Sequence, residues 1–445
     1  MDGAFLYTLQ NQKEVRDPYG IRMDSKVIIP FKWLSKDGKL LLVARMLRTF
    51  AYGFLSVVLA IYLKLLGFND LYIGIILSVT LINSVVFTLI ASFYADRLGR
   101  RNVLIVYSAL MSISGLVFFV TSNYMALIVS AFIGTINVTG TETGAFLSIE
   151  QAMLPQTIND PKKRNTVYAL YNMAGTFAMS VGVLLSGLPH VFAQQYGWNQ
   201  IESIKPLFVL YSIIGLGVLG IYFLISRRVE LSRSNNNAIN TLTPFKQTLS
   251  PKSKEIVGKL SGLFAIDSFA GGFVIQSIVS FWFFTKFGVE LATLSYIFSI
   301  AGVLTAFSFL VAAKIADKIG LINTMVFTHI PSNILLILVA FAPTLPLAIA
   351  LYLSRMALSQ MDVPTRQSYI VAVVEEDERT AAAGITNISR NIAQSVSPSL
   401  AGYILQSLSF LSAPFVLGGI LKIVYDIALY FNFKSIKPPD ERRSK

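Results

Sequence analysis

Apolar residues gather in twelve blocks, each about as long as a helix that crosses a lipid bilayer. A bilayer core needs about 20 consecutive apolar residues in helical form. In lipid, a helix satisfies all of its backbone polar groups within one segment. The sequence therefore predicts an all-α integral membrane protein with twelve transmembrane helices. The predicted segments, numbered 1 to 12 in chain order, are residues 40–63, 71–93, 102–122, 125–149, 165–188, 206–226, 259–284, 291–313, 321–341, 346–371, 381–408 and 412–433.

The basic residues lie almost entirely on one side of these segments. With the N-terminus inside, 29 of the 37 Lys and Arg fall in the inner segments, and the outer loops hold only Lys64, Lys205 and Lys286. Because Lys and Arg accumulate in cytoplasmic loops, we expect a multi-pass protein of the cell membrane with both termini cytoplasmic. The net charge of +13 then reflects topology and attraction to anionic lipids. We expect no nucleic-acid partner.

The residue content argues against catalysis. Only 14% of the chain is charged and 54% is hydrophobic, whereas soluble domains are about 25% charged. With no cysteine and two histidines, thiolate metal sites and cysteine nucleophiles are excluded. No metal-ligand cluster, nucleophile elbow or phosphate loop is found in the sequence. We therefore predict that the protein is not an enzyme and holds no metal and no cofactor.

A long polar stretch divides the twelve segments into six and six. A short motif also recurs, because residues 96–102 after segment 2 match residues 317–323 after segment 8 at an offset of 221. A second match in segments 5 and 11, at an offset of 215, has the same order and orientation. Parallel repeats of this kind place the substrate near mid-membrane between the halves. The predicted units are an N-terminal segment 1–39, a six-helix bundle 40–226, a linker 227–258, a second six-helix bundle 259–433 and a tail 434–445.

The first copy of the motif, Asp96-Arg97-Leu98-Gly99-Arg100-Arg101, resembles the signature loop Gly-x-x-x-Asp-Arg-x-Gly-Arg-Arg of the major facilitator superfamily. The resemblance covers roughly residues 38–433. It implies a secondary transporter that works by alternating access, with segments 1, 4, 7 and 10 around a central cavity. The chain departs from the family in two ways. In the signature loop, Ser92 replaces the leading glycine. In segment 4, the Arg-x-x-Gln-Gly motif that looks important for proton coupling in many drug exporters is missing.

The two copies of the motif supply candidate gating residues. The acidic residue can sit against the positive end of a helix, the glycine permits a tight turn, and the arginines can pair with carboxylates or lipid phosphates. Such contacts would latch the halves in one state. A basic turn that only fixes topology is the alternative. The candidates are Asp96, Arg97, Gly99, Arg100 and Arg101 in the first copy and Asp317, Lys318 and Gly320 in the second.

Ionisable side chains within the predicted helices are candidates for the substrate or coupling site. A charge in the hydrocarbon costs about 2.5–3.5 kcal/mol on insertion scales, so each one is a functional hypothesis by default. Arg45 is the shallow exception, which we expect to extend to the headgroups. The candidates are Arg48, Glu142, Asp267, Arg355, Asp362 and Arg390.

Structural roles compete with these assignments. In one interpretation Arg355 forms a permanent structural salt bridge with Asp267 or Asp362, because a buried charge needs a partner even when the residue has no role in transport. For Glu142 there are two hypotheses: it transfers protons, or it makes a structural contact between a helix and a loop at the cytoplasmic end. Arg390 binds ligand or satisfies carbonyls and neighbouring amides.

Five further residues are given structural roles. We expect Lys422 and Asp426 to form an intrahelical pair on segment 12, which the resemblance puts at the periphery. Glu150 and Arg366, at equivalent ends of segments 4 and 10, are interpreted as latches between the halves. His329 is expected to be a hydrogen-bonded helix residue rather than a proton carrier.

These observations favour proton-coupled efflux of a small organic molecule by a monomer. In that hypothesis Asp267 and Glu142 gain and lose protons, while Arg355 binds an anionic group. A uniporter or proton symporter for an organic anion is the alternative, favoured by Arg355 and Arg390 at mid-membrane. A membrane sensor or lipid-translocating scaffold that does not transport is a third interpretation. The expected partners are a small-molecule substrate, H⁺ and anionic lipids.

Overall fold

A computed structural model describes residues 33–158, 164–226, 249–375, 378–407 and 410–436. In these residues the chain forms sixteen α-helices, one short 3-10 helix and no strand. The first group of helices is α1 (Lys36–Leu65), α2 (Asp70–Leu98), α3 (Arg100–Val120), α4 (Tyr124–Ile133), α5 (Ala145–Met153), α6 (Arg164–Leu185), α7 (Leu188–Tyr196) and α8 (Gln200–Leu224). The second group is α9 (Pro251–Gly272), α10 (Gln276–Phe287), α11 (Leu291–Ile319), α12 (Leu321–Phe341), α13 (Leu345–Ser359), α14 (Asp362–Ala372), α15 (Arg379–Ser407) and α16 (Ala413–Phe433). The 3-10 helix is Leu154–Thr157.

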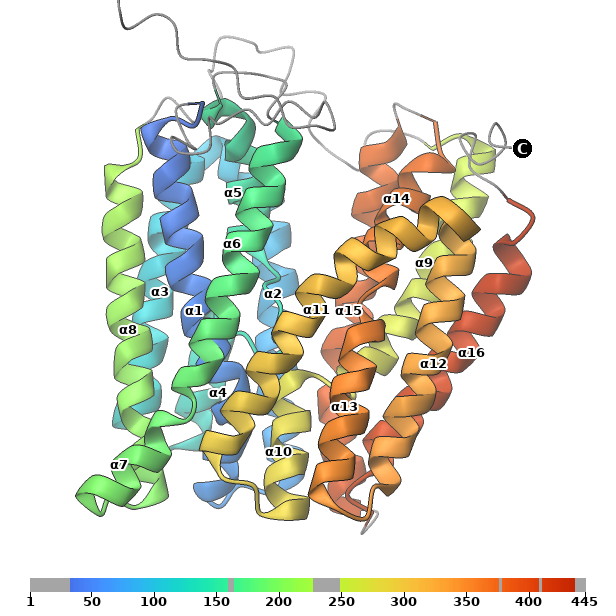
Figure 1. Ribbon diagram of the computed structural model, residues 1–445. Coiled ribbons are helices and arrows are strands. Elements are labelled where there is room, and N and C mark those ends of the chain that lie inside the picture. The colour runs from blue at the N-terminus through green and yellow to red at the C-terminus, as the bar shows by residue number, and fades with distance from the viewer. Residues whose placement is uncertain (1–32, 159–163, 227–248, 376–377, 408–409, 437–445) are drawn as a thin grey trace, which may run out of the picture.

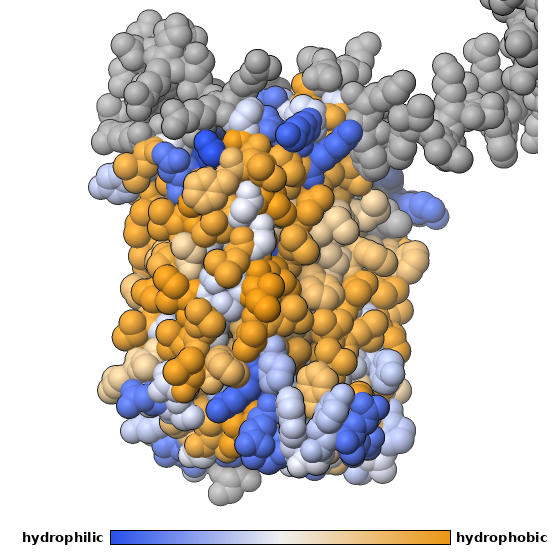
Figure 2. Space-filling view, turned by 90° about the vertical axis from the view of Figure 1, so that its left-hand side faces the viewer, coloured by the Kyte–Doolittle hydropathy of each residue, from blue (hydrophilic) through white to orange (hydrophobic). Residues whose placement is uncertain are grey.

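Apolar surface surrounds the middle of the bundle, as a membrane-spanning fold requires. Within the described residues, nine stretches are long and apolar enough to cross a membrane, and they correspond to segments 1–3, 5–9 and 12. Segments 4 and 10 are each split into two short helices, and segment 11 is rich in polar residues. Figure 2 shows a broad hydrophobic band between two hydrophilic ends. Segments 4, 10 and 11 are therefore less apolar than the other nine, because each contains either a break in the helix or many polar residues.

Local capping explains several helix starts. The side chains of Asn69, Asn123 and Asn199 accept hydrogen bonds from backbone N–H groups three residues later, at 2.9, 3.1 and 2.8 Å. Ser35 and Ser250 do the same for α1 and α9. The first N–H groups of a helix have no partner within it, so these caps fix where each helix begins.

Segment 4 is not the continuous helix that we predicted over 125–149. It breaks between α4 and α5, over residues 134–144. Asn137 accepts from the Thr139 N–H at 3.0 Å and donates to the Thr141 carbonyl at 2.7 Å. Local bonds of this kind compete with the helical ladder, and Gly140 and Gly144 then take φ angles of +77° and +105°.

The break in segment 4 is matched by breaks in segments 7 and 10, which we also predicted as continuous. Segment 7 is interrupted between α9 and α10, and segment 10 between α13 and α14. At the start of α10, the Ser277 N–H donates to the Val138 carbonyl in the segment 4 break at 3.2 Å. Non-helical backbone at membrane depth persists only where protein or water satisfies it, and here one break helps to satisfy the other.

The helices form two groups of six segments that lie side by side (Figure 1). In the first half α1 packs against α6 and α3 against α8, while in the second α9 packs against α15 and α12 against α16. The main hydrophobic core runs through both halves, and a smaller one around Phe264 and Tyr425 lies within the second half. We call the face where α8 ends and α9 begins the linker face. The other is the opposite face.

The two halves meet in the part of the bundle nearer the opposite face. Ser277 and Ser280 of α10 donate from their hydroxyls to the carbonyls of Ser56 and Val57 in α1, at 2.7 and 2.8 Å. Ser299 of α11 donates to the Ser180 carbonyl of α6 at 3.1 Å. We call this set of contacts, together with the α2–α15 contact described below, the seam.

The α2–α15 contact is a close approach of two backbones at Gly74 and Gly402. A Cβ atom added to Gly74 would lie 2.3 Å from the Pro398 carbonyl oxygen, and one added to Gly402 would lie 2.3 Å from the Asp70 carbonyl oxygen. The Ser399 N–H also donates to the Ser78 hydroxyl at 2.9 Å. Small residues let membrane helices approach this closely.

Candidate functional site

Arg48 of α1 lies at the centre of a buried charge network in the first half. Its Nε donates to Glu142 Oε1 at 2.6 Å, and its Nη2 donates to Glu150 Oε2 at 2.6 Å. Arg45, one turn earlier, binds the second carboxylate oxygen of Glu142. All four side chains are buried. Because two arginines face two glutamates, the network is neutral.

Two tyrosines complete what we call the first-half network. Tyr222 of α8 donates to Glu150 Oε1 at 2.6 Å and accepts from Arg48 Nη1 at 2.7 Å. Tyr171 of α6 donates to the other oxygen of Glu150, and its ring centre lies 4.1 Å from the guanidinium carbon of Arg45. A buried ion pair is tolerated when such bonds satisfy its remaining atoms. The network thereby joins α1, segment 4, α6 and α8.

Asp267 of α9 is the corresponding centre in the second half. Its Oδ1 accepts from Lys422 Nζ of α16 at 2.6 Å, and its Oδ2 lies 3.4 Å from Arg366 Nη1 of α14. The same nitrogen of Arg366 donates to Asp362 Oδ2 at 2.5 Å, one helical turn away. All four side chains are buried. They connect α9 and α16 to the start of α14, where segment 10 is broken.

A histidine extends this second-half network. His329 Nδ1 of α12 lies 2.8 Å from Asp426 Oδ1 of α16, and Asn333 donates to Asp426 Oδ2 at 2.9 Å. The other ring nitrogen, Nε2, lies 3.9 Å from Asp267 Oδ1. His329 is 3% exposed and Asp426 is 1% exposed. The second-half network thus consists of Asp267, His329, Asn333, Asp362, Arg366, Lys422 and Asp426.

The predicted pair between Lys422 and Asp426 is wrong. Lys422 bonds to Asp267, and Asp426 bonds to His329 and Asn333. At this turn α16 packs against α9 and α12, so both charges face inward rather than toward lipid. The sequence signal that was available is the pair itself, because two charges on an apolar helix each need a partner.

The predicted latches at Glu150 and Arg366 are also wrong. Each side chain is buried and bonded within its own half, Glu150 to Arg48 and Arg366 to Asp362. Arg45 likewise does not extend to the headgroups, because it is 6% exposed and paired with Glu142. A charge that can reach a partner in low dielectric gains more there than at the surface.

Arg355 and Arg390 differ from every cation above. Arg355 is 7% exposed, yet no described carboxylate lies within ion-pair distance of it, and its Nε has no hydrogen-bond partner among the described residues. The predicted bridges to Asp267 and Asp362 are therefore wrong. Its Nη1 lies 3.3 Å from the Met356 sulfur. Arg390 of α15 donates from Nε to the Ser268 hydroxyl at 2.9 Å and likewise has no ion pair in the described part of the chain.

The signature loop has the turn that a glycine permits, and two of its arginines bond to backbone carbonyls. Gly99 and Gly320 end α2 and α11 with φ angles of +90° and +87°. Arg100 donates to the Ala152 carbonyl at 2.8 Å, and Arg101 donates to the Tyr222 carbonyl at 2.9 Å, all within the first half. These bonds tie α3 to α5 and α8.

The remaining residues of the two loop copies carry less structural information. Asp317 and Lys318 are exposed. The side chains of Asp96 and Arg97 lie outside the described residues. The predicted latch between the halves therefore stays a prediction.

One carboxylate outside the membrane-spanning helices fastens the start of α9. Glu378, just before α15, accepts from the Ser250 N–H. Hydrogen bonds from the Ser253 hydroxyl and this N–H lower the pKa of Glu378. The contact joins the loop between α14 and α15 to α9 at the linker face.

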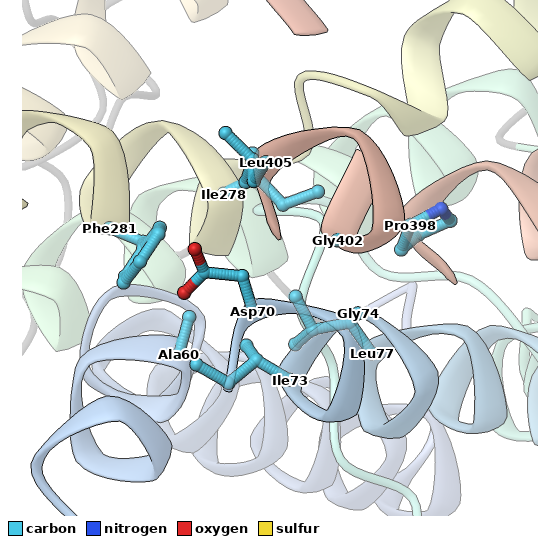
Figure 3. Close-up of a pocket in the computed structure, with 10 residues that line it drawn as sticks. All are labelled: Ala60, Asp70, Ile73, Gly74, Leu77, Ile278, Phe281, Pro398, Gly402 and Leu405. Carbon is cyan, nitrogen blue, oxygen red and sulfur yellow. The ribbon is translucent and has the colours of Figure 1, made fainter. Parts of the chain in front are cut away.

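Two small cavities lie near the breaks and the seam. One, of about 20 Å³, lies beside the segment 4 break and is lined by polar side chains that include Asn83, Thr135 and Asn137. The other, of about 10 Å³, lies between the halves, with Asp70 of α2 and Phe281 of α10 in its wall (Figure 3). One water needs about 10–15 Å³ measured in this way. Neither cavity therefore holds an organic substrate in this conformation.

Comparison with known proteins identifies the family. An uncharacterized membrane protein of Saccharomyces cerevisiae, YJR124C, is 28% identical over 439 residues, which cover 93% of this chain and 98% of that protein. The fold is similar to a variant of the nucleoside transporter NupG, with a TM-score of 0.72 at 13% identity, covering 89% of this chain and 100% of the other. It is also similar to the D-xylose-proton symporter, with a TM-score of 0.69 at 15% identity, covering 88% and 97%. The sequence profile of the Major Facilitator Superfamily matches residues 41–361. The chain belongs to the Major Facilitator Superfamily.

Proposed function

We propose that this protein is a secondary active transporter of a small organic anion, coupled to proton movement and working by alternating access. The observation that carries the proposal is Arg355, a buried cation with no carboxylate partner in the described residues. Family membership and fold support a secondary transporter rather than an enzyme. The anionic substrate and the coupling ion are the parts that we add.

An unpaired buried arginine is a poor structural element but a good anion receptor. A charge at membrane depth costs about 2.5–3.5 kcal/mol, and the other buried cations of the two networks recover that cost through carboxylates. Arg355 recovers it only when an anion arrives. Its planar guanidinium matches carboxylate and phosphate groups with two parallel hydrogen bonds.

The surroundings of Arg355 support a substrate that is partly apolar. Tyr352, one turn before it, packs its ring edge-on against Phe283 of α10 and Phe298 of α11, with ring centres 5.8 and 5.6 Å apart. Arg390 carries a second cation on α15 with only a serine partner. An anionic group against the arginines and an organic body against the rings would use both features.

The seam supports alternating access. The halves are bonded to each other near the opposite face, through side-chain hydroxyls and carbonyls rather than through large apolar surfaces alone. By the positive-inside rule the linker face is cytoplasmic. We therefore propose that this conformation is closed toward the outside and that the seam separates when the outer side opens.

Arg355→Gln should reduce transport of anions strongly. Hydrogen bonds to a charged group contribute about 1.5–3 kcal/mol, so we expect kcat/KM to fall about 10- to 150-fold. The measurement uses proteoliposomes with an internal pH dye and a panel of labelled carboxylates and organic phosphates added outside. The direction of proton movement with the active compound distinguishes symport from efflux antiport.

The control removes a positive charge elsewhere. Lys259→Gln takes away an exposed cation that, among the described residues, pairs with Glu255 on the surface of α9, and it should transport like the parent protein. If Arg355→Gln also transports anions like the parent, the proposed anion site is wrong. Uptake without any proton movement would indicate a uniporter.

A further inference from the structure

We propose that the coupling proton is held on His329 Nε2, between Asp426 and Asp267 in the second-half network. The inference deepens the proposed function, because it assigns the proton of that transport cycle to one nitrogen atom. His329 joins two carboxylates from two different helices, at 2.8 Å from Asp426 and 3.9 Å from Asp267. From the sequence, Asp267 and Glu142 are the candidate proton carriers, and His329 is expected to be a hydrogen-bonded helix residue instead.

The bond to Asp426 fixes which ring nitrogen carries the first proton. An ionised carboxylate only accepts hydrogen bonds. Asp426 already accepts from Asn333 on Oδ2, and its Oδ1 faces His329 Nδ1 at 2.8 Å. With Asp426 ionised we therefore assign His329 Nδ1 as the N–H donor, so that Asn333 Nδ2, 3.3 Å from the same nitrogen, donates to Asp426 instead. In the neutral ring Nε2 then carries a lone pair.

The lone pair on Nε2 is where a second proton would bind. Nε2 faces Asp267 Oδ1 at 3.9 Å, too far for a hydrogen bond, and two acceptors without a proton between them do not attract each other. A proton taken from water forms an N–H bond at Nε2 and makes the ring a cation. The new donor then attracts Asp267 Oδ1, and release returns the proton to water on the other side.

The charge count of the network also leaves room for this proton. With a neutral histidine the three carboxylates of the network exceed its two cations by one, and with a protonated histidine the network is neutral. Arg390 of α15, which bonds to Ser268 beside Asp267, is a further cation outside this count. Burial in low dielectric penalises any net charge. The carboxylates are Asp267, Asp362 and Asp426, and the cations are Arg366 and Lys422.

The helices packed against α12 are α11, α13, α14 and α16. The charged residues of α11, which are Lys314, Asp317 and Lys318, are all exposed. From α13 the only charged residue is Arg355. The groups that face the ring are Lys422, Tyr425 and Asp426 from α16, Asp267 from α9, and Asp362 and Arg366 from α14.

Protonation of His329 changes the partners that hold the anion site. Asp267 Oδ1 is now bonded to Lys422 at 2.6 Å, and a cationic imidazole would compete for that oxygen. The residue after Asp267 is Ser268, which binds Arg390. The carboxylate also reaches Arg366, at the break in segment 10 that carries Arg355. One proton thus acts on α9, whose Ser268 binds Arg390, and on α14, which follows α13 and its Arg355 along the chain.

The chain offers a direct test of where the proton resides, because it has only two histidines. In a His190→Gln variant labelled with ¹³C- and ¹⁵N-histidine, His329 gives the single imidazole signal. We expect this signal to convert from the neutral Nδ1–H form to the cation within about pH 5–8, the range in which histidine charge changes. Asp426→Asn should move the midpoint by at least about one pH unit.

The second test follows coupling with whichever anion the transport panel identifies. With the membrane potential clamped at zero, one H⁺ per anion and a one-unit pH gradient support about tenfold accumulation. His329→Gln should abolish accumulation while anion exchange continues within about threefold of the parent. His190→Gln is the matched control, because the described ion-pair partner of the His190 side chain is Glu290, near the opposite face and outside both networks, and it should accumulate anion normally.

The outcomes separate this inference from the proposed function. If no anion is transported by the parent protein, the proposed function is wrong, and the imidazole titration still tests the proton site. A signal that stays neutral from pH 5 to 8, or gradient-driven accumulation by a folded His329→Gln protein, overturns the inference. Should His329→Gln elute as aggregate, Asp426→Asn takes its place in the transport assay.

Discussion

Arg48→Gln is expected to destabilise the folded protein by about 3–5 kcal/mol, the loss that follows when one partner of a buried ion pair is removed. Within the described part of the chain, Arg48 is the one side chain that bonds to both Glu142 and Glu150. Without it, Glu150 keeps only tyrosine hydroxyls in a site with no exposed surface. The measurement is the midpoint of thermal unfolding of the purified protein in detergent, followed by tryptophan fluorescence.

The double variant Arg48→Gln with Glu150→Gln tests this explanation. Because it removes a cation and an anion together, it should be more stable than Arg48→Gln alone. Lys259→Gln, which breaks an exposed pair with Glu255, should change stability by at most about 1 kcal/mol. Equal midpoints for Arg48→Gln and Lys259→Gln would show that the first-half network does not hold the fold together.

The number and order of the twelve apolar segments could be predicted because composition carries that information. The sixteen helices could not, because segments 4, 7 and 10 are each broken and α7 follows α6 as a separate helix. Twelve apolar blocks with a polar linker between the sixth and seventh correspond to helices whose ends the structure places within a few residues. The second half starts earlier than predicted, with α9 at Pro251 rather than residue 259. The first turns of α9, which Ser250 caps, contain Lys and Glu residues and are therefore too polar to be recognised as part of a membrane segment.

The breaks could not be predicted from hydropathy, since they depend on local bonds that compete with the helix. Within a long apolar segment, the Thr and Asn residues around Asn137 are compatible with a continuous helix, so no break was predicted there. Their side chains instead bond to the backbone of Thr139 and Thr141. The available signal was the density of glycine and of short polar side chains over 134–144.

The position of each charged residue within its apolar segment predicted which charges lie inside the bundle, but it did not predict their partners. Arg48, Glu142, Asp267 and Asp362 all lie in the two networks. Which cation meets which carboxylate depends on which helices are neighbours, and this is a tertiary property. Asp267 meets Lys422 only because α9 packs against α16, a contact between residues that are far apart in the sequence.

Gly402→Val should reduce transport strongly without unfolding either half. Its side chain would occupy the space of the Asp70 carbonyl, 2.3 Å from the new Cβ, so α2 and α15 cannot approach and the seam cannot close. Overpacking costs about 1–3 kcal/mol, which shifts a two-state equilibrium about 5- to 150-fold. In the proposed cycle this shift favours the conformation that is open at the opposite face. Anion exchange in proteoliposomes should fall accordingly.

The opening itself is measurable because the chain contains no cysteine. Ser277→Cys places one thiol in the seam, where the serine is fully buried and bonded to the Ser56 carbonyl. A membrane-impermeant maleimide should label it slowly in the parent background and at least about tenfold faster with Gly402→Val. Gly384→Val on the same helix has no neighbour within 4 Å of its Cβ and should leave the labelling rate unchanged. Equal labelling rates in all three proteins would contradict a seam that opens and closes, since a barrier that never separates is insensitive to the packing of α2 against α15.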